Sequence, residues 1–191
     1  VEKIKDLKSL APHFHLSLQS GSDRILALMK RKYNSKQAMQ SIERLRAAIP
    51  NVKFTTDIIT GFPGETDEDF EASCDFVRKA GFLMVHAFPY SKRKGTPAAA
   101  MKEQIPEDVK KQRVHTLSEI CREVRSEILD GIVSEHRPIE VLFESFDGEY
   151  VSGHTSDFVE VKVKSEHGMH GVIASVLPVS HDGDVCIGEL I

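Results

Sequence analysis

The stretch KFTTDIITGFPGET, residues 53–66, decides the fold of this chain. Its first eight residues are mostly apolar or β-branched, which predicts a buried strand over residues 53–60. Two glycines and a proline at positions 61–64 then shape a rigid turn that brings the backbone close to a ligand. Thr66, with Asp69 three residues later, is close to a capping box and begins a helix. A strand that passes through a turn into a helix is the repeating unit of parallel α/β folds.

The same unit occurs on both sides of this stretch. Upstream, the alternation Phe14-His15-Leu16-Ser17-Leu18 predicts a strand, and a helix follows over residues 35–48, with Ser35 as its N-cap and Pro50 as its stop. Downstream, residues 82–90 predict a third strand. The order strand, helix, strand, helix, strand predicts parallel strands with crossover helices, as in half of a TIM-like barrel.

The rest of the chain changes its pattern twice. Residues 106–135 keep a helical apolar stripe behind Pro106, which suits a first helical turn. After Pro138 the period becomes two, and five short strands separated by turn residues predict a small antiparallel β-barrel. We therefore divide the chain into an α/β domain over residues 1–100, a linker helix over 101–136 and a β-barrel over 137–191.

Charge divides the chain at the same place. Residues 1–136 carry 22 Lys and Arg against 19 Asp and Glu, whereas residues 137–191 carry 3 against 10. With 40% hydrophobic and 28% charged residues in a length of 191, the composition is that of an ordinary globular protein. No apolar run approaches the roughly 20 residues of a membrane span, so we expect a cytoplasmic location without membrane attachment.

The three cysteines do not form a recognisable motif. Cys74, Cys121 and Cys186 lie far apart, without a CxxC or CxxxCxxC spacing. Reduced, buried thiols are therefore expected. His13 and His15 lie two residues apart on one strand face, which also fits a metal site, but no third ligand is evident and a structural or pocket role is the expected one.

Polar and glycine residues gather where each predicted strand ends. Ligands of parallel α/β folds bind at the carboxyl ends of the strands, so these residues are the candidate site. Each group has a structural alternative: a turn that caps the next helix, an Asp satisfied by its neighbours, or a solvated basic loop. The candidates are Gln19, Ser20, Asp57, Gly61, Phe62, Tyr90, Arg93 and Lys94.

Three motifs taken together indicate a family. HLSLQSGSD (residues 15–23), TDIITGFPGET (56–66) and FPYSKRKGTPAA (88–99) resemble the radical-SAM methylthiotransferases. The five-strand unit resembles the TRAM domain that ends these enzymes. The variants HLSL (15–18) and HAFPYSK (86–92) look most like the branch that acts on N6-threonylcarbamoyladenosine at position 37 of tRNA, and less like the isopentenyladenosine or ribosomal-protein branches.

The resemblance implies a chemistry that depends on cofactors. Members carry two 4Fe-4S clusters, cleave S-adenosylmethionine to a radical, and insert a methylthio group at carbon 2 of the adenosine, while the protein supplies positioning and electrostatics. By this resemblance the S-adenosylmethionine side is lined by Gln19, Ser20, Asp57, Gly61 and Phe62, and the substrate mouth by Tyr90, Arg93 and Lys94. Neither cysteine motif of the family is present, so we expect an inactive C-terminal part of a longer enzyme, without bound cofactors.

Two alternatives and two expectations follow. A methylthiotransferase for a basic ribosomal protein would suit the acidic last domain, and a non-enzymatic binding module is the other alternative. For tRNA, phosphate contacts favour basic surfaces, which are the loop of Lys92, Arg93 and Lys94 and a linker face with Lys110, Lys111 and Arg113. Half a barrel also leaves an unpaired strand edge at residues 14–19, so self-association is expected.

Overall fold

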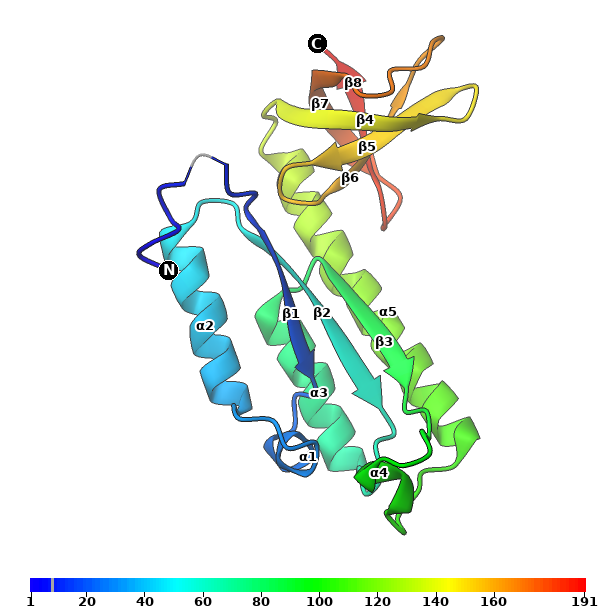
Figure 1. Ribbon diagram of the computed structural model, residues 1–191. Helices are drawn as coiled ribbons and strands as arrows, with labels where there is room; N and C mark the ends of the chain where they lie inside the picture. The colour runs from blue at the N-terminus through cyan, green and yellow to red at the C-terminus, as the bar shows by residue number, and fades with distance from the viewer. Residues whose placement is uncertain (8) are drawn as a thin grey trace.

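The computed structural model describes residues 1–7 and 9–191 as an α/β unit and a small barrel joined by one long helix (Figure 1). The α/β unit contains β1 (His13–Gln19), α1 (Asp23–Leu28), α2 (Ser35–Ala48), β2 (Lys53–Thr60), α3 (Asp67–Ala80), β3 (Met84–Pro89) and the short α4 (Pro97–Ala100). The long helix is α5 (Glu107–Ser134), and the barrel contains β4 (Ile139–Phe146), β5 (Tyr150–Thr155), β6 (Glu160–Lys164), β7 (Ile173–His181) and β8 (Cys186–Leu190).

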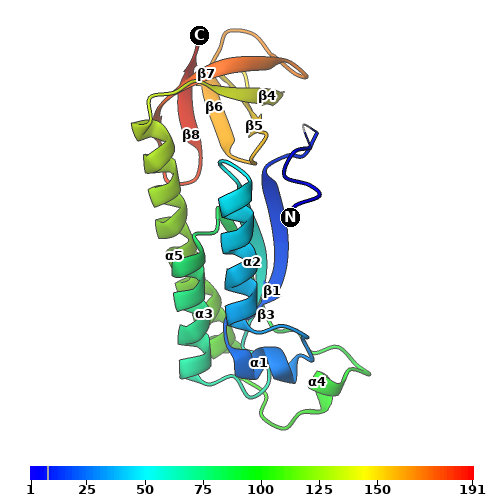
Figure 2. The ribbon, with the colours of Figure 1, turned by 90° about the vertical axis from the view of Figure 1, so that its left-hand side faces the viewer.

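The sheet of the α/β unit is parallel in the order β1-β2-β3, which confirms half of a TIM-like barrel. Figure 2 shows α2, α3 and α5 together on one face of this sheet. Their apolar stripes bury Phe54 and Ile58 of β2 and Leu18 of β1 in a shared core. The opposite face carries exposed polar and aromatic side chains, among them His15 and His86, and none of the helices in the described part of the chain covers it.

Capping side chains set the helix starts. Thr66 and Asp69 form the expected capping box at α3, with both reciprocal hydrogen bonds made. Helix α2 begins where predicted, but its N-cap is Asn34 and not Ser35. The Asn34 side chain accepts a hydrogen bond from the Gln37 N–H, and the Gln37 side chain accepts one from the Asn34 N–H. Gly81 ends α3 in the left-handed conformation that favours glycine.

The predicted five-stranded barrel is confirmed and closes in the order β4-β5-β6-β8-β7. Four of its strand pairs are antiparallel, whereas β6 and β8 run parallel, in contrast to the purely antiparallel barrel expected. An odd number of strands cannot alternate in direction all the way round a closed ring, so one parallel pair is unavoidable. Gly153 is required where β5 crosses β4, since a Cβ there would lie 1.9 Å from the Leu142 carbonyl oxygen.

Helix α5 is shared by both cores. Its first half packs Leu117 and Ile120 against the sheet, and near its end Leu129 enters the barrel core beside Val141 and Phe143. With 28 residues it is about 42 Å long. The barrel therefore sits at the amino ends of the parallel strands, while the carboxyl ends point away from it (Figure 1).

Within residues 1–7 and 9–191, none of the helices combines the length and the apolar character that crossing a membrane requires.

Candidate active site

A groove of about 530 Å³ lies at the carboxyl ends of the parallel strands. Gln19 borders it from the end of β1, Asp57 from β2, and Tyr90 and Arg93 from the segment after β3. Four of the eight residues expected at the site are thus brought to one groove from positions up to 74 residues apart. A smaller neighbouring hollow of about 310 Å³ shares Gln19 and Tyr90 and adds Phe62.

Gln19 holds an unusual backbone conformation at this groove. Its φ is 72°, and the register of β1 against β2 shifts between Leu16 and Gln19. A left-handed conformation costs a non-glycine residue roughly 1 kcal/mol or more, and such residues gather at ligand sites. The Tyr33 hydroxyl, which donates to the Ser17 and Leu18 carbonyls at 2.7 and 3.0 Å, fixes the backbone within the shifted segment.

Tyr90 presents a buried hydroxyl that has no hydrogen-bond partner within the described residues. Its ring is held on two sides: the Phe62 ring packs edge-on with 5.4 Å between centroids, and the Lys110 ammonium lies 5.4 Å from the ring centre. Its backbone N–H donates to the Thr60 carbonyl at 2.8 Å. Leaving a buried polar group unpaired costs about 1–3 kcal/mol, so this hydroxyl fits a ligand that supplies the missing partner.

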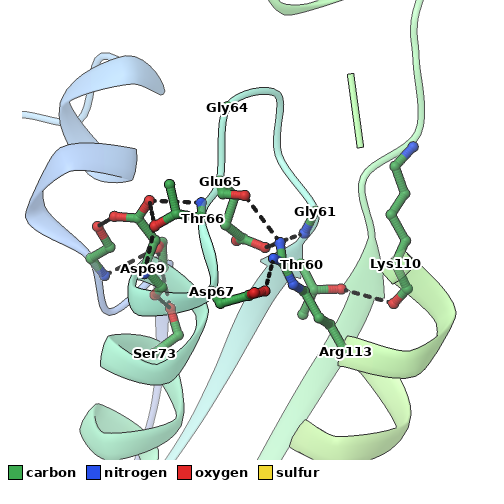
Figure 3. A network of polar contacts seen from close by, with 12 residues as sticks. Thr60, Gly61, Gly64, Glu65, Thr66, Asp67, Asp69, Ser73, Lys110 and Arg113 are labelled. Carbon is green, nitrogen blue, oxygen red and sulfur yellow. Dashed lines mark hydrogen bonds and ion pairs between the residues drawn. The ribbon is translucent and has the colours of Figure 1, made fainter. Parts of the chain in front are cut away.

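The loop between β2 and α3 is fixed by a buried carboxylate, which Figure 3 shows. Glu65, 4% exposed, accepts from the Gly61 N–H at 2.7 Å and from Arg113 Nη1 at 2.6 Å. Burial raises the pKa of Glu65, although the Gly61 N–H and the Arg113 guanidinium both act to lower it. Arg113 Nη2 also donates to Asp67 at 2.7 Å.

A second carboxylate ties the same loop to α1. Asp69 accepts from the Ser22 hydroxyl at 2.6 Å, from the Thr66 N–H at 2.9 Å, and from Arg24, which also donates to the Gly64 carbonyl. Burial acts to raise the pKa of Asp69, but the hydrogen bonds from Arg24, Ser22 and Thr66 outweigh it and hold the pKa far below its usual range.

The remaining expected residues lie outside the main groove. Ser20 is fully buried, and its hydroxyl faces Ser73 of α3 and the Ser22 N–H. Gly61, with φ 70°, packs under the Lys110 side chain, where a Cβ would lie 2.4 Å from Cγ. Phe62 is 6% exposed and borders only the smaller hollow, and Lys94 lies on an open surface with Lys92.

The expected basic face of the linker helix is wrong in part. Lys110 is 3% exposed and pairs with Glu107 at 2.7 Å, while Arg113 is 7% exposed and engaged with Glu65. Both side chains make internal contacts. Of these three cations, only Lys111 is exposed and can contact a phosphate. The sequence signal was present, because Arg113 falls four residues before buried Leu117 on the same helix face.

A row of polar side chains on the open face of the sheet was not foreseen as a unit. His13 Nε2 and His15 Nδ1 both bond to the Thr55 hydroxyl, at 3.1 and 3.0 Å, and His15 Nε2 lies 3.2 Å from Asp57. The His15 and His86 rings are 6.3 Å apart. This row leads from the amino ends of the strands to Asp57 at the groove.

The described residues do not fit an iron–sulfur cluster. No group of three or more His, Cys, Asp or Glu is placed to hold a metal ion within residues 1–7 and 9–191. Cys74 and Cys186 are buried, and burial raises the pKa of each thiol to about 11, which disfavours the thiolate that binds metals. Any cluster ligands would have to come from other residues.

Comparisons with known proteins agree on one family. Residues 1–77 match the Radical SAM superfamily. A tRNA-2-methylthio-N(6)-dimethylallyladenosine synthase of Lachnoclostridium phytofermentans is 40% identical over 193 residues, which cover 100% of this chain and 42% of that protein. The threonylcarbamoyladenosine tRNA methylthiotransferase MtaB of Bacillus subtilis is 36% identical over 180 residues, covering 92% of this chain and 40% of that protein. The chain therefore spans about two fifths of the length of these curated relatives.

Proposed function

Because this chain belongs to the radical-SAM methylthiotransferase family, we propose that it is the C-terminal part of an enzyme that adds a methylthio group to a modified adenosine of tRNA. The groove at the strand ends carries this proposal, since it joins Gln19, Asp57, Tyr90 and Arg93 from three strands. A tRNA substrate would place the enzyme in the cytoplasm. The full-length enzyme would use S-adenosylmethionine and two 4Fe-4S clusters, with the cluster ligands supplied outside the residues described here.

We propose that S-adenosylmethionine binds in this groove. When bound, it would supply the radical for the reaction. Tyr90 was expected at the substrate mouth, but we assign it to the cofactor side because it borders the same groove as Gln19 and Asp57. The unpaired Tyr90 hydroxyl, the Gln19 amide and the Asp57 carboxylate are groups that can hydrogen-bond a nucleoside. Gly61 and Phe62 would support this side from the adjacent loop, and Ser20 would act only through its backbone turn, because its hydroxyl bonds to Ser73 and Ser22.

The base modification we favour is N6-threonylcarbamoyladenosine, at carbon 2 of position 37. Its threonyl carboxylate is an anion, and Arg93 stands at the mouth of the groove with Lys92 and Lys94 beside it. A guanidinium binds a carboxylate through charge-assisted hydrogen bonds. The second candidate is the apolar dimethylallyl group, which the name of the 40% identical relative favours.

Mass spectrometry of tRNA nucleosides separates the two candidates. The full-length gene is expressed in a host that lacks tRNA methylthiotransferases, and the digested tRNA is analysed. The methylthio derivative of N6-threonylcarbamoyladenosine is the expected product, and loss of most of it in Arg93→Ala would support the carboxylate contact. Methylthiolation of the dimethylallyl nucleoside alone would select the second candidate, and no methylthiolated nucleoside would refute tRNA as substrate.

A further inference from the structure

Two cationic side chains of helix α5, Arg113 and Lys110, contact the loop that borders the groove. Arg113 Nη1 bonds to the Glu65 carboxylate at 2.6 Å and to the Glu65 carbonyl at 3.3 Å (Figure 3). One turn earlier, the Lys110 stem covers Gly61, and the Lys110 carbonyl accepts from Thr60 Oγ1 at 3.5 Å. Both ends of residues 60–65 are thus held by one helix face.

Stability alone does not explain this buried ion pair. Glu65 and Arg113 are 4% and 7% exposed, and desolvation offsets much of the attraction between buried charges. What the pair adds is geometry. One carboxylate oxygen, Oε2, accepts from both Arg113 and the Gly61 N–H, so the guanidinium determines where the start of the loop lies.

The position of the loop affects the groove through the chain from Gly61 to Phe62 and through the contact of Phe62 with Tyr90. Phe62 follows Gly61 in the chain, and its ring meets the Tyr90 ring edge-on at 5.4 Å. Tyr90 borders both hollows and carries the unpaired hydroxyl. A displacement of the loop would therefore move the ring that presents this hydroxyl to a ligand.

We propose that Glu65 and Arg113 are positioning residues: through Gly61 and Phe62 they hold Tyr90 in place, and so helix α5 sets the affinity of the groove for its nucleoside cofactor. The affinity half of this statement rests on the proposed function, because it takes S-adenosylmethionine as the ligand. The positioning half concerns the ligand-free chain and does not depend on what binds.

Amide hydrogen exchange of the 191-residue chain tests the positioning half. In Arg113→Met, the Gly61 amide, which donates to the Glu65 carboxylate, should exchange at least about 10-fold faster than in wild type, while the Val77 amide, in the last turn of α3, keeps its protection. Arg78→Met, which removes an exposed cation paired with Glu71 and Asp75, is the matched control and should change neither. Equal acceleration at Gly61 and Val77, or none at Gly61, would overturn the proposal.

A conservative variant keeps the test decisive if Arg113→Met does not fold. Arg113→Lys retains a cation that reaches one acceptor but cannot span Glu65 and Asp67 together. We expect intermediate protection of Gly61, with Val77 unchanged. Protection of Gly61 equal to wild type in Arg113→Lys would mean that the paired geometry is not what holds the loop.

Binding to the full-length enzyme tests the affinity half. The dissociation constant of S-adenosylmethionine should rise about 5- to 10-fold in Arg113→Lys and stay within about 2-fold in Arg78→Met. Unchanged affinity in Arg113→Lys despite faster Gly61 exchange would overturn this half. If the wild-type enzyme does not bind S-adenosylmethionine, the proposed function fails, and the exchange experiment still decides the role of Glu65 and Arg113.

Discussion

The ring of His13 stacks on the ring of Phe158, with 4.5 Å between centroids and 17° between planes. This contact joins the first strand of the parallel sheet to the turn between β5 and β6 of the barrel. Phe158 also stacks on His154, with 5.1 Å between ring centroids. Phe158 has a φ of 73°, a conformation that is rare for an aromatic residue and persists only where the surroundings fix it.

Because of this strain, we expect glycine at position 158 to be more stable than alanine, the reverse of the usual order in a strand. Phe158→Ala should lower the free energy of unfolding by about 1–2 kcal/mol through loss of the stack. Phe158→Gly should be more stable than Phe158→Ala by about 1 kcal/mol, because glycine adopts a positive φ without strain. Urea denaturation measures both. At Phe146, which is similarly exposed within strand β4, glycine should instead be worse than alanine. The same order at both sites would contradict the strain at Phe158.

Asp69 should contribute to the acid sensitivity of the chain. Its pKa in the folded chain lies below the ordinary carboxyl value of 3.8, so its contribution is present above about pH 4 and is lost as the pH falls towards the folded-state pKa. In Asp69→Asn the free energy of unfolding should therefore fall less between pH 5 and about pH 2 than in wild type. Urea titrations across this range measure the slope. Asp75→Asn, at a half-exposed site of the same helix, is the control and should keep the wild-type slope.

Local patterns predicted the elements because their causes are local. A run of mostly apolar or β-branched residues placed β2 at residues 53–60, as the structure has it, and Thr66 with Asp69 placed the start of α3. The wrong N-cap predicted for α2 has a local reason too. Asn and Ser are equally good N-cap residues, and the hydrogen bond from the Asn34 N–H to the Gln37 side chain selects Asn34.

The sequence predicted those parts of the site that follow from the strand topology and not those that depend on long-range side-chain contacts. Carboxyl ends of parallel strands meet, so Gln19, Asp57 and Tyr90 were expected together. Arg113 meets Glu65 across 48 residues, and no spacing rule reveals such a pair. Ser20 lies inside a conspicuous motif, yet its hydroxyl faces Ser73, because the turn at Gly21 lies directly against α3.

The open sheet predicts self-association. Among the residues that the structure describes, strand β1 lies at the edge of the sheet and pairs only with β2, so its other edge offers unpaired backbone groups to a second chain. Light scattering during size-exclusion chromatography should show a mass above the 21.4 kDa monomer that rises with concentration. Ser17→Lys, a charge at an exposed position of this edge strand, should shift the chain towards monomer. A monomeric mass for the wild-type chain at high concentration would refute edge pairing.

The position of the basic loop predicts which end of the molecule meets tRNA. Arg93→Ala combined with Lys94→Ala in the full-length enzyme should weaken tRNA binding and flatten the slope of log affinity against log salt by up to about two units. Lys162→Ala with Lys164→Ala removes two cations from the acidic barrel, at the opposite end of the sheet, and should leave the slope nearly unchanged. The reverse result would assign the RNA surface to the barrel.

The Tyr90 hydroxyl gives the most direct test of the groove as the cofactor site. Tyr90→Phe removes a buried hydroxyl that has no hydrogen-bond partner among residues 1–7 and 9–191, and it changes little else. The dissociation constant of S-adenosylmethionine for the full-length enzyme should rise about 5- to 10-fold in Tyr90→Phe, as expected for one lost hydrogen bond. Tyr150→Phe, on the barrel, should bind as wild type does. Wild-type affinity in Tyr90→Phe would contradict the assignment of this groove to the cofactor.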